Sequence, residues 1–214
     1  LFTDIKEGAN LINSASLSLD EVLDIIFDSI AKGLSVARVH TGDPSMYGAI
    51  REQMVALDKE GIEYEVIPGV SSVFAGAAAM KKEFTLPGVT QTLILTRMAG
   101  RTPVPEAESI ENLAKIQASM AIFLSIASID ELAKKLMTSY PKDTPAAVVH
   151  KASWPDQKII VSTLECIADK VKEADINKTA LVYVGRFLAD EFELSKLYDK
   201  HFSHEFREAK DARR

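Results

Sequence analysis

The chain has 214 residues, 47% hydrophobic and 26% charged, which is ordinary for a globular protein with a sizeable core. Its formal net charge of -6 argues against a general nucleic-acid binder, because such a protein needs many cations to neutralise phosphates. A single cysteine excludes a disulfide framework, and no apolar run approaches the roughly 20 residues that span a bilayer, so we expect a cytoplasmic protein without a membrane partner.

The first strong pattern is helical. Residues 18–33 place apolar side chains on one side of a helix, with Ser18 and Glu21 spaced as a capping box. Gly33 follows the last periodic residue, where a helix commonly ends in a left-handed conformation. An alternating α/β domain normally opens with a strand, and here polar residues precede the helix, so we expect the first strand to be missing.

The next segments predict further alternation of strands and helices. Apolar and polar residues alternate over residues 35–41 and 62–69, which predicts two strands. Helical spacing follows each of them, over residues 44–61 and 71–82. The first third of the chain is therefore predicted to be an α/β domain.

A break in this pattern over residues 82–89 predicts a domain boundary. We expect an N-terminal domain over residues 1–86, incomplete at its start, and a C-terminal domain over residues 87–200. The charged, aromatic segment 201–214 is expected to fray.

The second domain is predicted to hold a mixed sheet, because two of its strands are separated only by a short turn with the sequence WPDQ. Its helices are expected over residues 128–140, with Ser128 and Glu131 as a capping box, and over residues 164–174. Its strands are expected over residues 90–97, 121–125, 144–153, 157–163 and 179–185.

A Gly-Asp-Pro corner follows the strand expected over residues 35–41. Asp43 before Pro44 suits a helix N-cap, and on that reading the corner is purely structural. Gly42 has no Cβ, so a ligand can also approach the backbone there, at the carboxyl end of a strand where α/β sheets bind ligands. A second corner, IPGVSS, follows the next strand and is expected at the same edge. The nucleotide patterns GxGxxG and GxxxxGK[ST] are absent from the sequence.

Five segments, in order and spacing, resemble the tetrapyrrole methyltransferases of cobalamin biosynthesis. They are VARVHTGDPSMYGAI, IPGVSSVFAGAAA, TQTLILTRMAGRTPVPE, VVHKASWPDQKI and ALVYVGR. TRMAGRTPVPE and HKASWPDQK are most similar to members that methylate carbon 11 of precorrin-4 or cobalt-precorrin-4. The resemblance covers residues 8–187 and implies two αβα domains, with S-adenosylmethionine in a cleft between them and the tetrapyrrole laid over it. The family's opening strand and Gly-Pro-Gly-Asp loop have no counterpart in this sequence.

The resemblance also implies a set of binding residues. The S-adenosylmethionine residues would be Thr41, Gly42, Asp43, Met46, Ser71, Ser72, Leu124 and Ala152. It implies a homodimer as well, for which the Ala-rich segment from Ser71 to Met80 offers close packing. No catalytic base is identified.

The tetrapyrrole carries many carboxylates, and the planar guanidinium of arginine suits carboxylate recognition. Arg97 and Arg101 flank Gly100 in the loop after a strand and are the first candidates, with Lys151 and Arg186 as weaker ones. Arg97 and Arg101 are equally well interpreted as solvated surface cations, and for Lys151 and Arg186 that interpretation is preferred.

Two histidines, the single tryptophan and the single cysteine are also considered as site residues. His40 and His150 lack a third ligand at usual spacing, so we expect no metal. Trp154 either stacks on the tetrapyrrole or caps a turn, and Cys166 is expected to pack.

Two further functions stay open from the sequence. One is methylation of a different tetrapyrrole, uroporphyrinogen or another precorrin. The other is a catalytically silent fragment that binds S-adenosylmethionine or dimerises.

Overall fold

The computed structural model describes residues 5–209 and divides the chain into two compact units, Leu1–Ser71 and Ser72–Arg214. The division lies before the boundary expected after residue 86, because Phe84 and Leu86 are buried in the core of the second unit. Within residues 5–209, no helix combines the length and apolar character that crossing a membrane requires.

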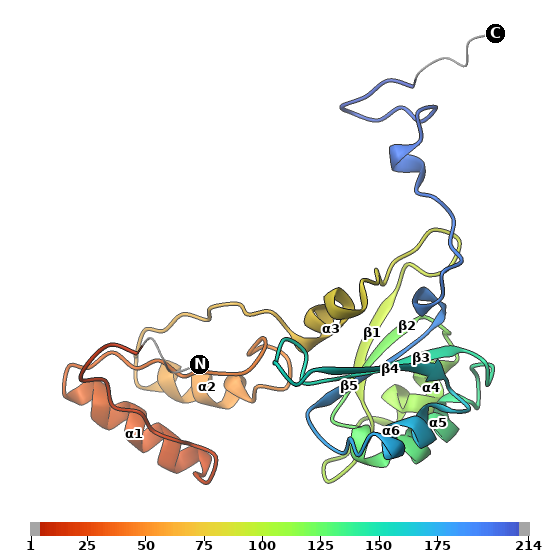
Figure 1. The fold of residues 1–214 in the computed structure, drawn as a ribbon. Helices are drawn as coiled ribbons and strands as arrows, with labels where there is room; N and C mark the ends of the chain where they lie inside the picture. The colour runs from red at the N-terminus through yellow and green to blue at the C-terminus, as the bar shows by residue number, and fades with distance from the viewer. Residues whose placement is uncertain (1–4, 210–214) are drawn as a thin grey trace. The chain divides into compact units, whose positions relative to one another are not determined.

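The first unit contains helices α1 (Leu19–Ala31) and α2 (Ile50–Lys59) (Figure 1). The capping box expected for α1 is confirmed. The backbone N–H of Glu21 donates to Ser18 Oγ at 3.3 Å, and the Ser18 N–H donates to Glu21 Oε2 at 2.7 Å. Gly33, at φ +72°, follows the helix as expected.

The two strands expected in the first unit, over residues 35–41 and 62–69, are wrong. Residues 5–71 contain no β-strand, and both segments run as irregular chain with exposed Val36 and Val66 side chains. Alternation of apolar and polar residues gives only a preference for extended backbone. A strand also needs a neighbour that accepts and donates its ladder hydrogen bonds.

The second unit is built on one mixed five-stranded sheet in the order β1-β2-β5-β3-β4, which confirms the mixed α/β fold. Strands β1 and β2 are parallel, and the other neighbours are antiparallel. Strands β3 and β4 form the expected antiparallel pair around the WPDQ turn, with Ala147 opposite Val161. The strand bounds are β1 Leu93–Arg97, β2 Ser119–Phe123, β3 Pro145–His150, β4 Lys158–Thr163 and β5 Ala180–Val184.

One face of this sheet is covered by helices α4 (Ile110–Ala114), α5 (Ile129–Leu136) and α6 (Ile167–Glu173) (Figure 1). Alternate strand residues such as Met120 and Val182 supply the sheet side of this core. Leu132 and Val171 are among the helix residues that cover them.

The opposite face is covered by α3 (Ser72–Met80) and the short 3₁₀ helix η3 (Arg186–Leu188). Tyr183 is fully buried there, and its Oη donates to the carbonyls of Ser72 at 2.9 Å and Val73 at 3.1 Å. A Cβ on Gly76 would lie 2.0 Å from Tyr183 Oη, so only glycine fits. Gly76 and Ala77 of α3 therefore pack against the chain's own sheet, while Phe74 and Ala78 on the other side of the helix are exposed.

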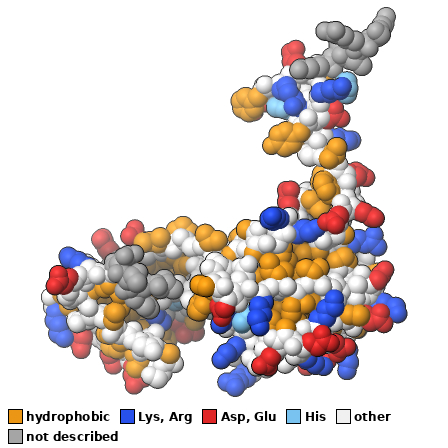
Figure 2. Space-filling view, viewed as in Figure 1, with side chains coloured by type: hydrophobic (Ala, Val, Ile, Leu, Met, Phe, Trp, Pro, Cys, Tyr) orange, Lys and Arg blue, Asp and Glu red, His pale blue; other side chains and the backbone are white. Residues whose placement is uncertain are grey.

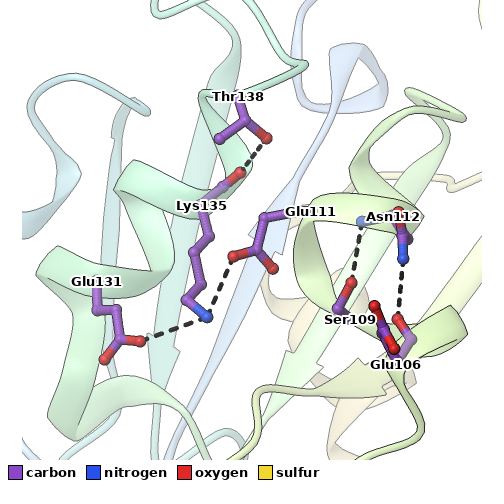
Figure 3. A network of polar contacts seen from close by, with 7 residues as sticks. All are labelled: Glu106, Ser109, Glu111, Asn112, Glu131, Lys135 and Thr138. Carbon is purple, nitrogen blue, oxygen red and sulfur yellow. Dashed lines mark hydrogen bonds and ion pairs between the residues drawn. The ribbon is translucent and has the colours of Figure 1, made fainter.

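An ion-pair network fastens α4 to α5 (Figure 3). Lys135 Nζ lies 3.2 Å from Glu111 Oε1 and 3.4 Å from Glu131 Oε1. The Glu111 carboxylate is the main cause of the raised pKa of Lys135. Glu131 is thus paired with a lysine on its own helix.

The capping box expected at Ser128 and Glu131 is consequently wrong. Ser128 is the N-cap of α5, but its side chain makes no capping hydrogen bond. It ends the 3₁₀ turn η2 (Ile126–Ser128) with ψ near 36°, whereas a capping serine is normally extended.

A capping serine is found instead at α4. The Asn112 backbone N–H donates to Ser109 Oγ at 3.3 Å, and Asn112 Nδ2 donates to the Glu106 carbonyl at 2.9 Å (Figure 3). The latter bond ties α4 to the 3₁₀ turn η1 (Glu106–Glu108) before it.

The chain continues beyond the sheet as a segment that includes the 3₁₀ turn η4 (Lys196–Tyr198). Residues 201–209, expected to fray, form a backbone bridge between His204 and Arg207, while residues 210–214 lie outside the described part.

Candidate functional site

The Gly-Asp-Pro corner of the first unit is organised by one carboxylate. Asp43 Oδ1 accepts the Ser45 N–H at 2.8 Å, and Oδ2 accepts the Gly69 N–H at 3.0 Å. Gly42 stands at φ +69°, in the left-handed region that glycine occupies without strain. Asp43 therefore shapes its own turn and also holds the second corner.

Asp43 does not cap a helix, so the expected helix over residues 44–61 begins too early. The structure starts α2 at Ile50. Tyr47 at φ +58° and Ala49 at φ +50° are left-handed and interrupt the helical path. The Asp-Pro pair closes a turn here instead.

The two glycine corners touch directly, although the strands expected to bring them to one sheet edge are absent from residues 5–71. A Cβ on Gly69 would lie 2.0 Å from the Gly42 carbonyl oxygen, so only glycine allows this approach. The sequence alone does not assign a function to Gly69. The Pro-Gly dipeptide that ends the second segment is the feature that indicates a turn there.

The electrostatics of the corner favour an ionised carboxylate. The Gly69 N–H, followed by the Ser45 N–H, lowers the pKa of Asp43 below its usual range. Thr41 and Gly42 are exposed, so their polar groups face solvent, while Met46 is half-buried. An exposed backbone corner beside an apolar side chain suits a ligand with a polar head and an apolar body.

Ser71 and Ser72 fall on either side of the division between the two units. Ser71 is buried, whereas Ser72 is exposed at the first position of α3. The carbonyl of Ser72 accepts from Tyr183, which fixes the start of the helix against the sheet.

In the second unit, four candidates gather at one edge of the sheet. Arg97 ends β1 and pairs with Phe123, the last residue of β2, so Leu124 comes next to it. Lys151 and Ala152 follow β3, and the Lys151 N–H donates to the Thr179 carbonyl just before β5, at 2.9 Å. Strand β5 lies between β2 and β3, so at roughly 5 Å per neighbouring strand Leu124 and the residues that follow β3 are about 10 Å or more apart across this edge.

Backbone strain marks the same edge. Leu124 at φ +53°, Lys151 at φ +48° and Ser153 at φ +72° are non-glycine residues in the left-handed region. Each costs on the order of 1 kcal/mol or more, and such residues cluster at ligand sites. Leu124 is also 76% exposed, an unusual surrounding for a large apolar side chain at a strand end. Ala152 packs against the core.

The candidate cations differ in whether their charged groups already interact with other groups of the protein. Arg97 donates to the carbonyls of Thr102 at 3.1 Å and Pro103 at 2.8 Å, which holds its own loop. Lys151 pairs with Asp156, lowering the pKa of that carboxyl, and its Nζ lies 5.6 Å from the centre of the Trp154 ring. Trp154 thus covers the turn, although it remains exposed.

Arg101 and Arg186 contrast with these two. Arg101 is exposed in the loop after β1 and joins no ion pair among residues 5–209. Arg186 follows β5, whose Val184 pairs with Met120 near the start of β2. Because β5 runs antiparallel to β2, Arg186 lies at the sheet edge opposite the other candidates. It lines a cavity there together with Gln117.

His40 and His150 are the two histidines that lie near candidate site residues in the sequence. The described residues contain no group of three or more His, Cys, Asp or Glu placed to hold a metal ion. Burial is the main cause that lowers the pKa of both His40 and His150. Cys166, which we expected to pack, is exposed beside the start of α6.

With this geometry established, comparison with known proteins gives consistent matches. Residues 3–168 match the family model of the tetrapyrrole (corrin/porphyrin) methylases. The cobalt-precorrin-4 C(11)-methyltransferase of Methanocaldococcus jannaschii is 51% identical over 206 residues, covering 95% of this chain and 80% of that protein. The precorrin-4 C(11)-methyltransferase of Pseudomonas aeruginosa is 45% identical over 202 residues, covering 94% of this chain and 81% of that protein.

A solved structure agrees with the sequence matches. The X-ray structure of a cobalt-precorrin-4 methyltransferase superposes with a TM-score of 0.84 at 46% identity, covering 86% of this chain and 77% of the other.

Proposed function

Because the chain belongs to the tetrapyrrole (corrin/porphyrin) methylases, we propose that it transfers a methyl group from S-adenosylmethionine to carbon 11 of precorrin-4 or cobalt-precorrin-4. The observation that carries this proposal is the 51% identity to a C(11)-methyltransferase over 95% of the chain. The reaction belongs to cobalamin biosynthesis, and we propose the cytoplasm as its location, in keeping with the single cysteine.

Methyl transfer from S-adenosylmethionine depends more on how the protein positions the two reactants than on a reactive side chain. The sulfonium of S-adenosylmethionine is the methyl electrophile, and an electron-rich pyrrolic carbon is the nucleophile. The carbon–methyl bond forms as the sulfur–methyl bond breaks, S-adenosylhomocysteine leaves, and a proton is lost from the ring. The protein holds the methyl group and the ring carbon in line at near-attack distance. We assign no catalytic base.

The residues of both units fit a methyl donor with a polar head and an apolar body. In the first unit the proposed cofactor residues are Thr41, Gly42, Asp43, Met46 and Ser71. In the second they are Ser72, Leu124 and Ala152. The exposed backbone at Gly42 supports this assignment, as does the strained backbone at Leu124. Asp43 acts there by ordering the corner, because its two oxygens already accept backbone N–H groups.

Arg101 is the proposed main contact with the substrate's carboxylates. Its guanidinium is exposed, whereas those of Arg97 and Lys151 serve neighbouring groups of the protein. Arg186 is the weakest candidate, since it lies at the other edge of the sheet. A homodimer is proposed as well.

The direct test is a methylation assay with purified protein and S-adenosylmethionine. Precorrin-4 and cobalt-precorrin-4 are supplied separately, with uroporphyrinogen III and precorrin-2 as competing substrates. We expect one added methyl group, located at carbon 11, on one of the first two. Methylation of uroporphyrinogen III or precorrin-2 instead would favour a different member of the family.

Cofactor binding separates an active enzyme from a silent fragment. Calorimetry is expected to show binding of S-adenosylhomocysteine that Gly42→Val abolishes, because a branched side chain is strained at φ +69° and blocks the corner. Binding without any methyl transfer would identify a silent binding fragment. Equal affinity of the Gly42→Val variant would count against this site.

A further inference from the structure

Residues 190–209, here named the C-terminal arm, expose an unusual amount of apolar surface. Tyr198 is 80% exposed, Leu194 84% and Phe206 87%. Six large apolar side chains of the arm are exposed in all: Phe192, Leu194, Leu197, Tyr198, Phe202 and Phe206. Figure 2 shows apolar side chains along this segment. Large apolar side chains gathered on one exposed segment indicate an interaction site, whereas singly scattered ones do not.

The arm is internally ordered, so these side chains sit on a shaped element. The Arg207 guanidinium donates to the carbonyl of Leu197 at 2.6 Å and to that of Asp199 at 2.7 Å. His204 and Arg207 exchange backbone hydrogen bonds, and Ser195 Oγ accepts the Leu197 N–H at 3.3 Å. A segment shaped before binding loses less conformational entropy when it docks.

The base of the arm is anchored to the second unit. Lys82 Nζ lies 2.7 Å from Asp190 Oδ1 and donates to the Ala189 carbonyl at 3.1 Å. The Glu193 N–H donates to the Pro87 carbonyl at 3.4 Å. The arm therefore leaves the sheet unit from a fixed point, and whatever covers its apolar side chains is held to that unit.

The exposed area matches what a stable dimer needs. The six exposures add up to about four whole side chains, or roughly 600–800 Å² at about 150–200 Å² each. A receiving surface of equal size makes one arm contact of about 1,200–1,600 Å², which alone reaches the standard size of a specific interface. Two-fold symmetry supplies the contact twice.

We propose that the C-terminal arm docks on a second copy of this chain, in a reciprocal exchange of arms between two protomers. The proposal rests on the homodimer proposed above and names the segment that forms it. A second copy also offers apolar surface to receive the arm. Ile159 and Val161 are exposed on β4, the last strand of the sheet order, whose outer edge is open to pairing.

Sedimentation velocity on the whole chain tests the arm. The variant Leu194→Asp/Tyr198→Asp/Phe206→Asp places three charges on the proposed contact, and we expect dimerisation to weaken by about 100-fold or more. The control Lys196→Ala/Glu205→Ala changes two polar residues of the same arm and is expected to leave dimerisation unchanged. Circular dichroism and S-adenosylhomocysteine binding report whether each variant is folded. Phe206→Asp alone replaces the triple variant if that one unfolds.

A photo-crosslinking benzophenone side chain at position 206 identifies what the arm touches. We expect covalent dimers of the whole chain. Crosslinks confined to a single chain overturn the proposal, as does a folded charge variant that dimerises with unchanged affinity. A monomeric wild-type chain overturns both the arm and the proposed homodimer, while S-adenosylhomocysteine binding still tests the proposed methyltransferase separately.

Discussion

Asp43 and Gly69 are joined across 26 residues of chain by a 3.0 Å hydrogen bond from the glycine N–H to the carboxylate. The same glycine lies so close to Gly42 that a Cβ would meet its carbonyl oxygen. The two corners, which the sequence predicted to lie at one sheet edge, are therefore parts of one structure without a sheet. Asp43 is its centre, because each of its two carboxylate oxygens accepts a backbone N–H.

Asp43→Asn tests whether this carboxylate orders the corner. The amide keeps one acceptor oxygen, so either the Ser45 or the Gly69 N–H loses its partner. We expect S-adenosylhomocysteine affinity to fall about tenfold or more, measured by calorimetry.

The pH dependence has a definite sign. Because the folded pKa of Asp43 is lowered, its contribution is complete above the usual carboxyl range and is lost as pH falls through the lowered pKa. The amide resonance of Gly69 is expected to follow this acid transition in the wild-type chain and to be flat in Asp43→Asn. A resonance that titrates in both would show that another group is responsible.

Gly69→Ala tests the contact between the corners. Its Cβ would lie 2.0 Å from a backbone oxygen, which has no flexible end to move away. We expect the free energy of unfolding to fall by about 1–3 kcal/mol and the cofactor affinity to fall with it. Gly100→Ala is the matched control, because a Cβ there meets nothing within 4 Å. Equal melting temperatures for the two variants would show that the corners separate at no cost.

Sequence patterns predicted the second unit far better than the first. The segments at β3 (PAAVVH) and β4 (KIIVST) are rich in Val and Ile and also have partners along the sheet, so residue preference and hydrogen bonding agree. Residues 62–66 alternate apolar and polar side chains but form no ladder, because strand pairing depends on a partner segment elsewhere in the chain as well as on local preference.

The sequence nominates residues for the candidate site but does not predict their contacts. Gly42 and Asp43 stand out in the sequence as a turn at which a ligand can approach. Arg97 donates to its own loop because of its side-chain rotamer, and Arg186 lies at the opposite edge because β5 runs antiparallel to β2. The spacing of residues in the sequence predicts neither the rotamer nor the strand direction.

Lys135→Met tests the α4–α5 network of Figure 3. Removing the pairs with Glu111 and Glu131 is expected to lower the free energy of unfolding by about 0.5–1 kcal/mol, since all three side chains are partly exposed. Lys134→Met, an exposed residue on the same helix, is the control and should change stability little.

The lysine's effect should fade at both ends of the pH range. The pKa of Glu111 is lowered first by its own backbone N–H and then by Lys135, so the lysine's share of this effect is lost in acid as the carboxylate is protonated. The pKa of Lys135 is raised, mainly by Glu111, so the stabilisation from the pair is lost in alkali as the lysine loses its proton. Urea unfolding across pH measures the difference between wild type and variant. A difference that does not change with pH would indicate lost packing of the lysine stem and not lost charge.

Arg101→Gln and Arg97→Gln separate substrate recognition from loop structure. An acidic protein binds a polycarboxylate only where positive charge is concentrated. Arg101, exposed and outside any ion pair of the described residues, is free to supply that charge, while Arg97 already binds the carbonyls of Thr102 and Pro103. Arg101→Gln is expected to raise the KM for the tetrapyrrole about tenfold or more and to leave S-adenosylhomocysteine affinity intact. Arg97→Gln is expected to speed hydrogen exchange in residues 98–104, because the loop loses the side chain that holds it. If Arg101→Gln left KM unchanged while Arg97→Gln raised it without loosening the loop, the two roles would have to be exchanged.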